Sequence, residues 1–207
     1  KLWWDAVPYT PAGIINLADL GNELYKDDNK NTIPYPWEGL NDKLYGLRTG
    51  ELVTFTSGTG MGKSSILREL MHHLLVNTKD NVGILAMEES VVYTAWNLMS
   101  VEASQRLYIK EIRDKFPKEQ LKAWEERTIG TRRFFAFKHL GSHGNEEILE
   151  RVRFMAKALD CKWIFIDHLS ILVSQDLDER RSIDNLMTSF IQIKEKNDVG
   201  IVLVSHL

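Results

Sequence analysis

The sequence has little cysteine and no long apolar run, and both absences exclude classes of protein. Cys161 is the only cysteine among 207 residues, so a fold held together by internal disulfides is excluded. A lone cysteine is typical of a reducing compartment. No apolar stretch approaches the roughly 20 residues of a membrane-spanning helix, and the first residues lack the apolar segment of a secretory signal. We therefore expect a cytoplasmic protein without a membrane partner.

An excess of basic charge is also missing. The 26 Lys and Arg residues face 29 Asp and Glu residues, which gives a formal net charge of −3. This balance does not advertise a nucleic-acid-binding protein, although a binding channel needs only local positive charge. The length suffices for one domain with a sizeable core. Because the chain does not begin with Met, we expect a fragment of a longer protein.

A glycine-rich loop between a predicted strand and a predicted helix carries the most chemical information. An apolar run over residues 52–56 precedes the loop, and a helical pattern begins at Ser65. The loop consists of Ser57, Gly58, Thr59, Gly60, Met61, Gly62, Lys63 and Ser64. It matches the phosphate-binding pattern G-x-x-x-x-G-K-[ST], except that Ser57 replaces the first glycine. In such loops successive backbone N–H groups and the following helix N-terminus face phosphate oxygens.

Two side chains of this loop have expected roles in holding a nucleoside triphosphate. Lys63 can reach the β- and γ-phosphates, and the Ser64 hydroxyl can ligate Mg²⁺. The alternative is a flexible glycine-rich loop with no ligand. The Gly-Lys-Ser sequence and the strand–helix context favour phosphate binding.

Strand and helix patterns alternate after residue 39. The predicted strands are mostly continuous apolar runs, which is typical of a parallel sheet covered on both faces. They span residues 51–56, 82–87, 133–138, 162–167 and 199–205. Amphipathic helices are predicted at 146–159, at 182–197 and over most of 91–129, with a new helix starting at Pro117. The predicted fold class is α/β, an open and mostly parallel sheet with helices on both faces.

The first 36 residues read as an arm separate from the core at 37–207. Asn16 is a candidate N-cap for a short helix that extends to Lys26. Its leucines recur at helical spacing, and so short a helix needs a surface on which to dock. These leucines are Leu17, Leu20 and Leu24.

Polar residues end three of the predicted strands, at the edge where parallel α/β sheets bind ligands. Asp167 fits a carboxylate that orients Mg²⁺ through water, or alternatively a residue that caps a turn. Glu88 could polarise the water that attacks the γ-phosphate, or could be a solvated acid. The adjacent Glu89 is expected to serve the start of the next helix. His206 could contact the γ-phosphate, or could be a solvated or core histidine.

Several ordered segments together resemble a known family, the RecA-like motor domain of superfamily 4 replicative DNA helicases. The resemblance is closest to the helicase half of tailed-phage primase–helicases, with DnaB and Twinkle as more distant kin. The segments are residues 57–64, 87–90, 166–171, 178–187 and 205–207.

This resemblance implies roles for individual residues. Lys63 and Ser64 would bind phosphates and Mg²⁺, and Asp167 would be the Walker B acid. Glu88 would be the catalytic base, and His206 would sense the γ-phosphate and couple hydrolysis to DNA. Arg180 and Arg181 would contact DNA phosphates from a channel-facing loop, although a solvated charge pair is an equal alternative.

The resemblance also implies an activity and an assembly. It predicts an ATP- or dTTP-hydrolysing 5′→3′ helicase that moves on single-stranded DNA as a ring, a hexamer, with Mg²⁺ as cofactor. The helix at 16–26 would dock on a neighbouring subunit, and a primase domain or partner is possible. A phage-encoded protein would work in the host cytoplasm. The family continues beyond Leu207 with a second DNA-binding loop and an arginine finger, so we expect a C-terminally incomplete core with weak hydrolysis.

Two other functions remain open from the residues. A different RecA-like ATPase, such as a strand-exchange recombinase, would pair DNA strands rather than unwind them. A nucleotide-binding oligomerisation module would lack motor activity, although the intact Lys63, Ser64, Glu88 and Asp167 argue against it.

Overall fold

The computed structural model describes residues 14–21, 25, 32–138, 145–169 and 179–206, the last of these by its backbone. The chain forms two compact units, Lys1–Lys30 and Asn31–Leu207. In the first unit, the described residues contain a 3₁₀ helix, η1 (Leu17–Leu20). The Asn16 side chain accepts a hydrogen bond from the Ala18 N–H at 3.1 Å, as expected of an N-cap. The predicted helix thus begins where expected, but Leu24 and Lys26 lie outside the described residues.

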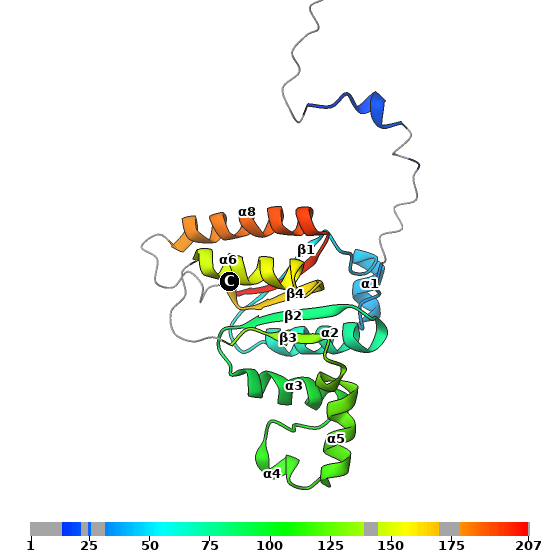
Figure 1. Cartoon of the computed structure of the whole chain (residues 1–207), viewed down its shortest axis with the longest axis vertical. Coiled ribbons are helices and arrows are strands. Elements are labelled where there is room, and N and C mark those ends of the chain that lie inside the picture. Colours follow the sequence, from blue (N-terminus) through cyan, green and yellow to red (C-terminus); the bar gives the residue numbers. More distant parts are fainter. Residues whose placement is uncertain (1–13, 22–24, 26–31, 139–144, 170–178, 207) are drawn as a thin grey trace, which may run out of the picture. The chain divides into compact units, whose positions relative to one another are not determined.

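A five-stranded parallel sheet forms the centre of the second unit (Figure 1). The strands are β1 (Leu52–Ser57), β2 (Asn81–Ala86), β3 (Phe134–Ala136), β4 (Cys161–Asp167) and β5 (Gly200–His206). Their order in the sheet is β1-β5-β4-β2-β3, and all four pairings are parallel. This arrangement confirms the predicted fold class.

The sheet is covered by helices on both faces. The helical elements of this unit are α1 (Glu38–Leu44), α2 (Lys63–Asn77), α3 (Val91–Ala103), α4 (Lys110–Arg113), α5 (Lys118–Arg127), η2 (Ile129–Thr131), α6 (Asn145–Lys157) and α8 (Glu179–Asn197). Figure 1 shows α6 and α8 on one face of the sheet and α2 on the other. No helix among the described residues is long and apolar enough to cross a membrane.

The predicted helix over 91–129 is divided into separate pieces. Ser90 caps α3 by accepting a hydrogen bond from the Tyr93 N–H at 3.2 Å. Ser104 ends α3 in a left-handed conformation with φ of 51°, and Pro117 is the N-cap of α5. These boundaries follow the break expected before Pro117.

Alternation along the central strands divides the core into two layers. Trp163 and Phe165 of β4 pack on the α2 side, whereas Ile164 and Ile166 pack on the α6–α8 side. Both layers are buried, which explains why these strands read as continuous apolar runs. A Cβ atom at Gly200 would lie 2.4 Å from Trp163 Cζ3, so this position requires glycine.

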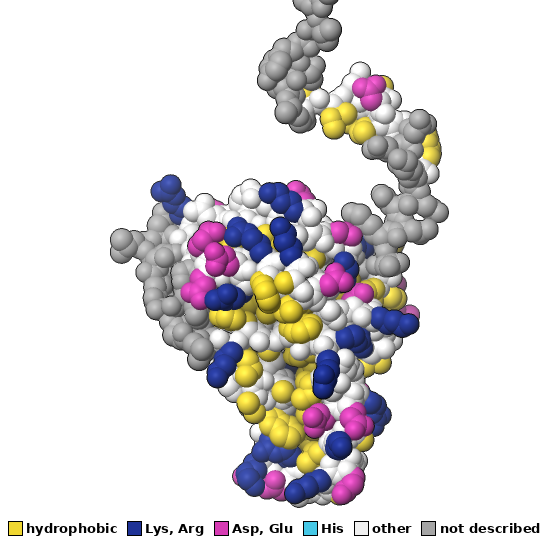
Figure 2. Space-filling model, in the orientation of Figure 1, with side chains coloured by type: hydrophobic (Ala, Val, Ile, Leu, Met, Phe, Trp, Pro, Cys, Tyr) yellow, Lys and Arg dark blue, Asp and Glu magenta, His cyan; other side chains and the backbone are white. Residues whose placement is uncertain are grey.

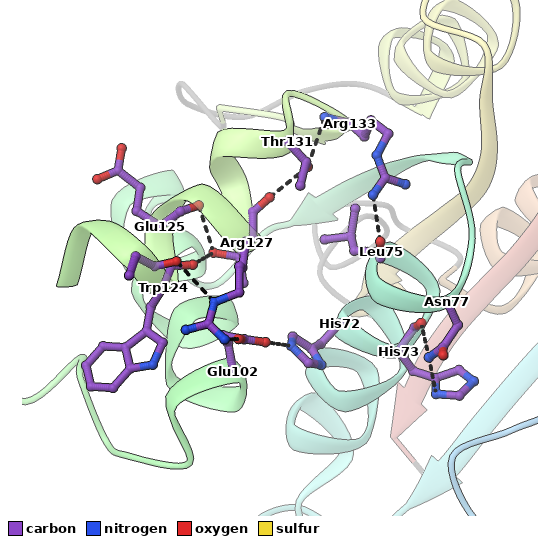
Figure 3. A network of polar contacts seen from close by, with 12 residues as sticks. His72, His73, Leu75, Asn77, Glu102, Trp124, Glu125, Arg127, Thr131 and Arg133 are labelled. Carbon is purple, nitrogen blue, oxygen red and sulfur yellow. Dashed lines mark hydrogen bonds and ion pairs between the residues drawn. The ribbon is translucent and has the colours of Figure 1, made fainter. Parts of the chain in front are cut away.

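Polar contacts fasten the α3–α5 region to α2 (Figure 3). His72 Nε2 on α2 lies 2.7 Å from a carboxylate oxygen of Glu102 on α3, and Arg127 on α5 lies 3.2 Å from the other oxygen. Arg133 donates to the Leu75 carbonyl at 2.6 Å near the end of α2. The helix that follows the glycine-rich loop is thereby held from both its side and its C-terminal end.

Candidate nucleotide site

The glycine-rich loop faces a pocket at the carboxyl edge of the sheet. Strand pairing places Ala86 of β2 beside Asp167 of β4, and Ser57 of β1 beside His206 of β5. The pocket has a volume of about 430 Å³, within the usual range for small-molecule sites. It is lined by Thr59, Gly60, Gly62, Lys63, Ser64, Ser65, Arg68, Glu88, Asp167 and His168.

Glycine conformations shape the loop. Gly60 and Gly62 have φ values of 78° and 87°, a left-handed region that glycine adopts at little cost. Gly62 is the N-cap of α2, and its carbonyl accepts from the N–H groups of Ser65 and Ile66 at 3.0 and 3.1 Å. The first helical turn therefore starts at the pocket, where its N-terminal dipole favours an anion.

Lys63 is buried against the loop from which it projects. The residue is 7% exposed, and its Nζ donates to the Ser57 and Gly58 carbonyls at 2.7 and 2.8 Å. Ser57 Oγ lies 3.4 Å from the same nitrogen. These oxygens satisfy the buried ammonium and fix it at the wall of the pocket.

Glu88 and Asp167 come to the pocket from neighbouring strands. The Met87 N–H donates to the Asp167 carbonyl at 2.9 Å and ties the two strand ends together. The Glu88 side chain is 59% exposed, and its Oε1 lies 2.8 Å from His168 Nε2. Asp167 is half-buried. The structure thus brings Lys63, Ser64, Glu88 and Asp167 to one pocket.

Glu89 turns away from this cluster and binds the helices. Its Oε2 accepts from Arg68 Nη2 at 2.8 Å and from Asn97 Nδ2 at 3.1 Å. Its Oε1 accepts from Thr94 Oγ1 at 2.8 Å. Because Thr94 and Asn97 belong to α3, these contacts agree with the expectation that Glu89 serves the start of the next helix.

The chemistry of the pocket suits Mg²⁺ bound together with a phosphate ligand. The Ser64 hydroxyl and the Asp167 carboxylate are the oxygen donors that this ion prefers. Among the described residues, no three His, Cys, Asp or Glu side chains are placed to hold a metal by themselves. A Mg²⁺ ion here would therefore depend on phosphate oxygens and water to complete its shell.

Three other predicted residues do not line this pocket. The His206 backbone ends β5 beside Ser57, and its side chain lies outside the described residues. Arg180 and Arg181 lie exposed in the first turn of α8. Their roles stay predictions.

Sequence reasoning did not assign a role in the pocket to Arg68 or His168. Arg68 follows Ser64 by four residues, so helical spacing places both on the same face of α2. His168 directly follows Asp167 at the end of β4. Both signals were available in the sequence as an i+4 spacing and a polar residue at a strand end.

Cys161 lies at the opposite end of β4 and plays no part in this pocket. Burial in the α6–α8 layer, aided by the charge of Asp160, raises the pKa of its thiol to about 12. The thiol is therefore neutral and behaves as an apolar core group.

The visible face in Figure 2 carries interspersed acidic and basic side chains, with hydrophobic groups between them. This mixture agrees with the small net charge of −3. A site for an anion on this molecule therefore depends on local groups such as Lys63 and the backbone of residues 58–64.

Comparison with known proteins gives consistent similarities. A family model described as DnaB-like helicase C terminal domain matches residues 33–207. The chain is 29% identical over 212 residues to the DNA helicase/primase of Enterobacteria phage T3, a match that covers 99% of this chain and 38% of that relative. It thus spans less than half of that relative's length.

Two solved structures share the fold at low sequence identity. An ATPase domain superposes with a TM-score of 0.70 at 20% identity, over 92% of this chain and 69% of that chain. A KaiC-like protein from the archaeon Pyrococcus horikoshii OT3 gives a TM-score of 0.60 at 16% identity, over 85% of this chain and 72% of that chain. These likenesses establish a RecA-like fold.

Proposed function

Since this chain belongs to the family of DnaB-like helicase C-terminal domains, we propose that it is the nucleotide-hydrolysing motor of a replicative DNA helicase. The observation that carries this proposal is the convergence of Lys63, Ser64, Glu88 and Asp167 on one pocket. These residues supply the parts that phosphoryl transfer to water requires.

Nucleotide binding is proposed at the glycine-rich loop, with ATP or dTTP as the substrate. The N–H groups of residues 58–64 would face the phosphates, and Lys63 would exchange its loop carbonyls for β- and γ-phosphate oxygens. Mg²⁺ held by Ser64 and, through water, by Asp167 supplies neutralisation of the phosphate charge.

Hydrolysis is proposed to use Glu88 as the general base. Its exposed carboxylate can accept a proton from a water while that water's oxygen attacks the γ-phosphorus. The bond to the β-phosphate oxygen then breaks, and its electron pair leaves with the nucleoside diphosphate. His206, at the same edge of the sheet, is proposed to contact the γ-phosphate and to couple its loss to DNA movement.

DNA binding and assembly are proposed from the remaining features. Arg180 and Arg181 would contact phosphates of single-stranded DNA in a central channel, and the ring, proposed as a hexamer, would move 5′→3′. The arm at residues 1–36 would dock on a neighbouring subunit, separate from the core at 37–207. The compact units divide between Lys30 and Asn31, and the family match starts at residue 33, which supports a boundary in this region.

The name of the phage relative suggests a primase domain or partner in the complete protein. We propose that the protein works in the cytoplasm, of the host if it is phage-encoded. Full activity is proposed for the assembled ring rather than for the isolated 207-residue chain.

The proposal is tested with the complete protein that carries this domain. Nucleotide hydrolysis is measured with and without single-stranded DNA, and unwinding is measured on forked duplexes with a 5′ or a 3′ tail. We expect DNA-stimulated hydrolysis and unwinding that requires the 5′ tail. Strand pairing without unwinding would indicate a recombinase, and ring formation without hydrolysis would indicate an oligomerisation module.

A further inference from the structure

A histidine without an assigned role lies against the proposed general base. His168 Nε2 is 2.8 Å from Glu88 Oε1, and both residues line the pocket with Lys63 and Ser64. Because a carboxylate only accepts hydrogen bonds, the contact requires the imidazole to carry a proton on Nε2.

The two partners differ in how firmly they are held. His168 is 7% exposed and follows β4, whose end is tied to Met87 by the hydrogen bond to the Asp167 carbonyl. The Glu88 side chain is 59% exposed. The fixed imidazole is therefore the group that limits where the mobile carboxylate can go.

The neighbouring carboxylate shows what this contact provides. Glu89 is held on both oxygens by Arg68, Thr94 and Asn97, so it has no freedom to serve the pocket. In the described part of the chain, Glu88 is held through Oε1 by His168. Its Oε2 is left to accept from water.

We propose that His168 is a positioning residue for nucleotide hydrolysis. Its Nε2–H holds Oε1 of Glu88 so that Oε2 faces the attacking water at the γ-phosphate. The water proton passes to Oε2, and the imidazole keeps its own proton throughout. This inference rests on the proposed function, because it takes Glu88 to be the base.

The expected size of the effect follows from the geometry of proton transfer. A base must lie within hydrogen-bond reach of the proton it takes, and displacement by about 1 Å can cost roughly 100-fold in rate. Loss of a group that orients a functional side chain costs about 10- to 100-fold in comparable sites. We therefore expect a loss of kcat in that range.

The experiment compares His168→Gln with His168→Asn in the complete helicase. The Gln amide nitrogen can reach near the position of Nε2, whereas the Asn amide ends near Nδ1 and is too short for Glu88. Steady-state hydrolysis is measured at saturating single-stranded DNA, together with nucleotide affinity, Mg²⁺ dependence and thermal melting. His73→Ala is the control, since His73 binds the Pro34 carbonyl away from the pocket.

We expect His168→Asn to lower kcat by about 10- to 100-fold, with KM, nucleotide affinity and half-saturating Mg²⁺ within about twofold. His168→Gln should recover much of kcat. In a Glu88→Gln background, His168→Asn should reduce the remaining rate by less than about twofold, because the bond no longer orients a base.

Two outcomes separate this inference from the proposed function. Equal kcat for the Asn and Gln variants, while Glu88→Gln abolishes hydrolysis, would overturn the positioning role and leave the motor intact. Full hydrolysis by Glu88→Gln would instead overturn the choice of base. A shift in half-saturating Mg²⁺ for His168→Asn would mean that the histidine acts through Asp167, and would also overturn the inference.

Discussion

Two adjacent glutamates should respond in opposite ways to the same substitution. Glu88→Gln and Glu89→Gln each remove one negative charge and preserve the shape of the side chain. Glu88 faces the pocket with a mostly exposed carboxylate, whereas Glu89 is 17% exposed and joins α2 to α3. The first change should therefore affect hydrolysis, and the second should affect stability.

The expected magnitudes come from these contacts. An amide cannot accept the proton of the attacking water, so Glu88→Gln should lower kcat by about 10²- to 10⁴-fold. Glu88 makes an exposed contact, so the free energy of unfolding should change by less than about 1 kcal/mol. Glu89→Gln weakens a charged hydrogen bond to Arg68, and such bonds contribute about 1.5–3 kcal/mol. Each kcal/mol lowers Tm by about 2–4 °C in a domain of this size.

The assay pairs hydrolysis by the complete protein with thermal melting. Nucleotide affinity is measured in parallel, because Glu88→Gln should keep binding. If Glu89→Gln abolished hydrolysis and Glu88→Gln melted early with normal kcat, the assignment of the base would be wrong.

Three further predictions concern other parts of the chain. Replacing Arg180 and Arg181 by Ala in the complete ring should weaken single-stranded DNA binding equally for all sequences, and should lower the slope of log affinity against log salt by about 0.7 per lost contact; an unchanged slope with normal nucleotide binding would make them solvated charges. Deleting residues 1–30 should reduce ring formation, measured by light scattering, and leave the core folded; an unchanged oligomeric mass would refute a docking role. The Cys161 thiol, with a pKa of about 12, should resist iodoacetamide at pH 8 until the protein unfolds, and its contribution to stability should be complete below about pH 9 and fall as pH rises toward 12, which Cys161→Ala should abolish.

Much of the fold was predictable because the sheet is buried on both faces. Continuous apolar runs located all five strands, and the amphipathic patterns located α6 and α8. The prediction for β3 was too long, since the strand spans Phe134–Ala136 at the edge of the sheet. Pairing extends beyond it through single hydrogen bonds from Val82 to the Arg133 carbonyl and from Phe137 to the Ile84 carbonyl.

The pocket was predictable where the strand order could be inferred from chemistry. Glu88 and Asp167 end apolar strands, and the parallel rule places such ends at one edge of the sheet. The contact between Glu88 and His168 was not predictable, because it requires β2 and β4 to be neighbours although they are distant in sequence. The network of Glu89 depends in the same way on how α2 packs beside α3.

Binding of Mg²⁺-nucleotide by this chain tests the central claim most directly. Titration calorimetry with ATP and with dTTP compares the wild type, Lys63→Ala and the control Lys162→Ala, whose lysine pairs with Asp160 at the far end of β4. Loss of a charged contact worth about 1.5–3 kcal/mol predicts that Lys63→Ala weakens binding by about 10- to 150-fold, with Lys162→Ala unchanged. Equal affinity in the wild type and Lys63→Ala would contradict a nucleotide site at this loop.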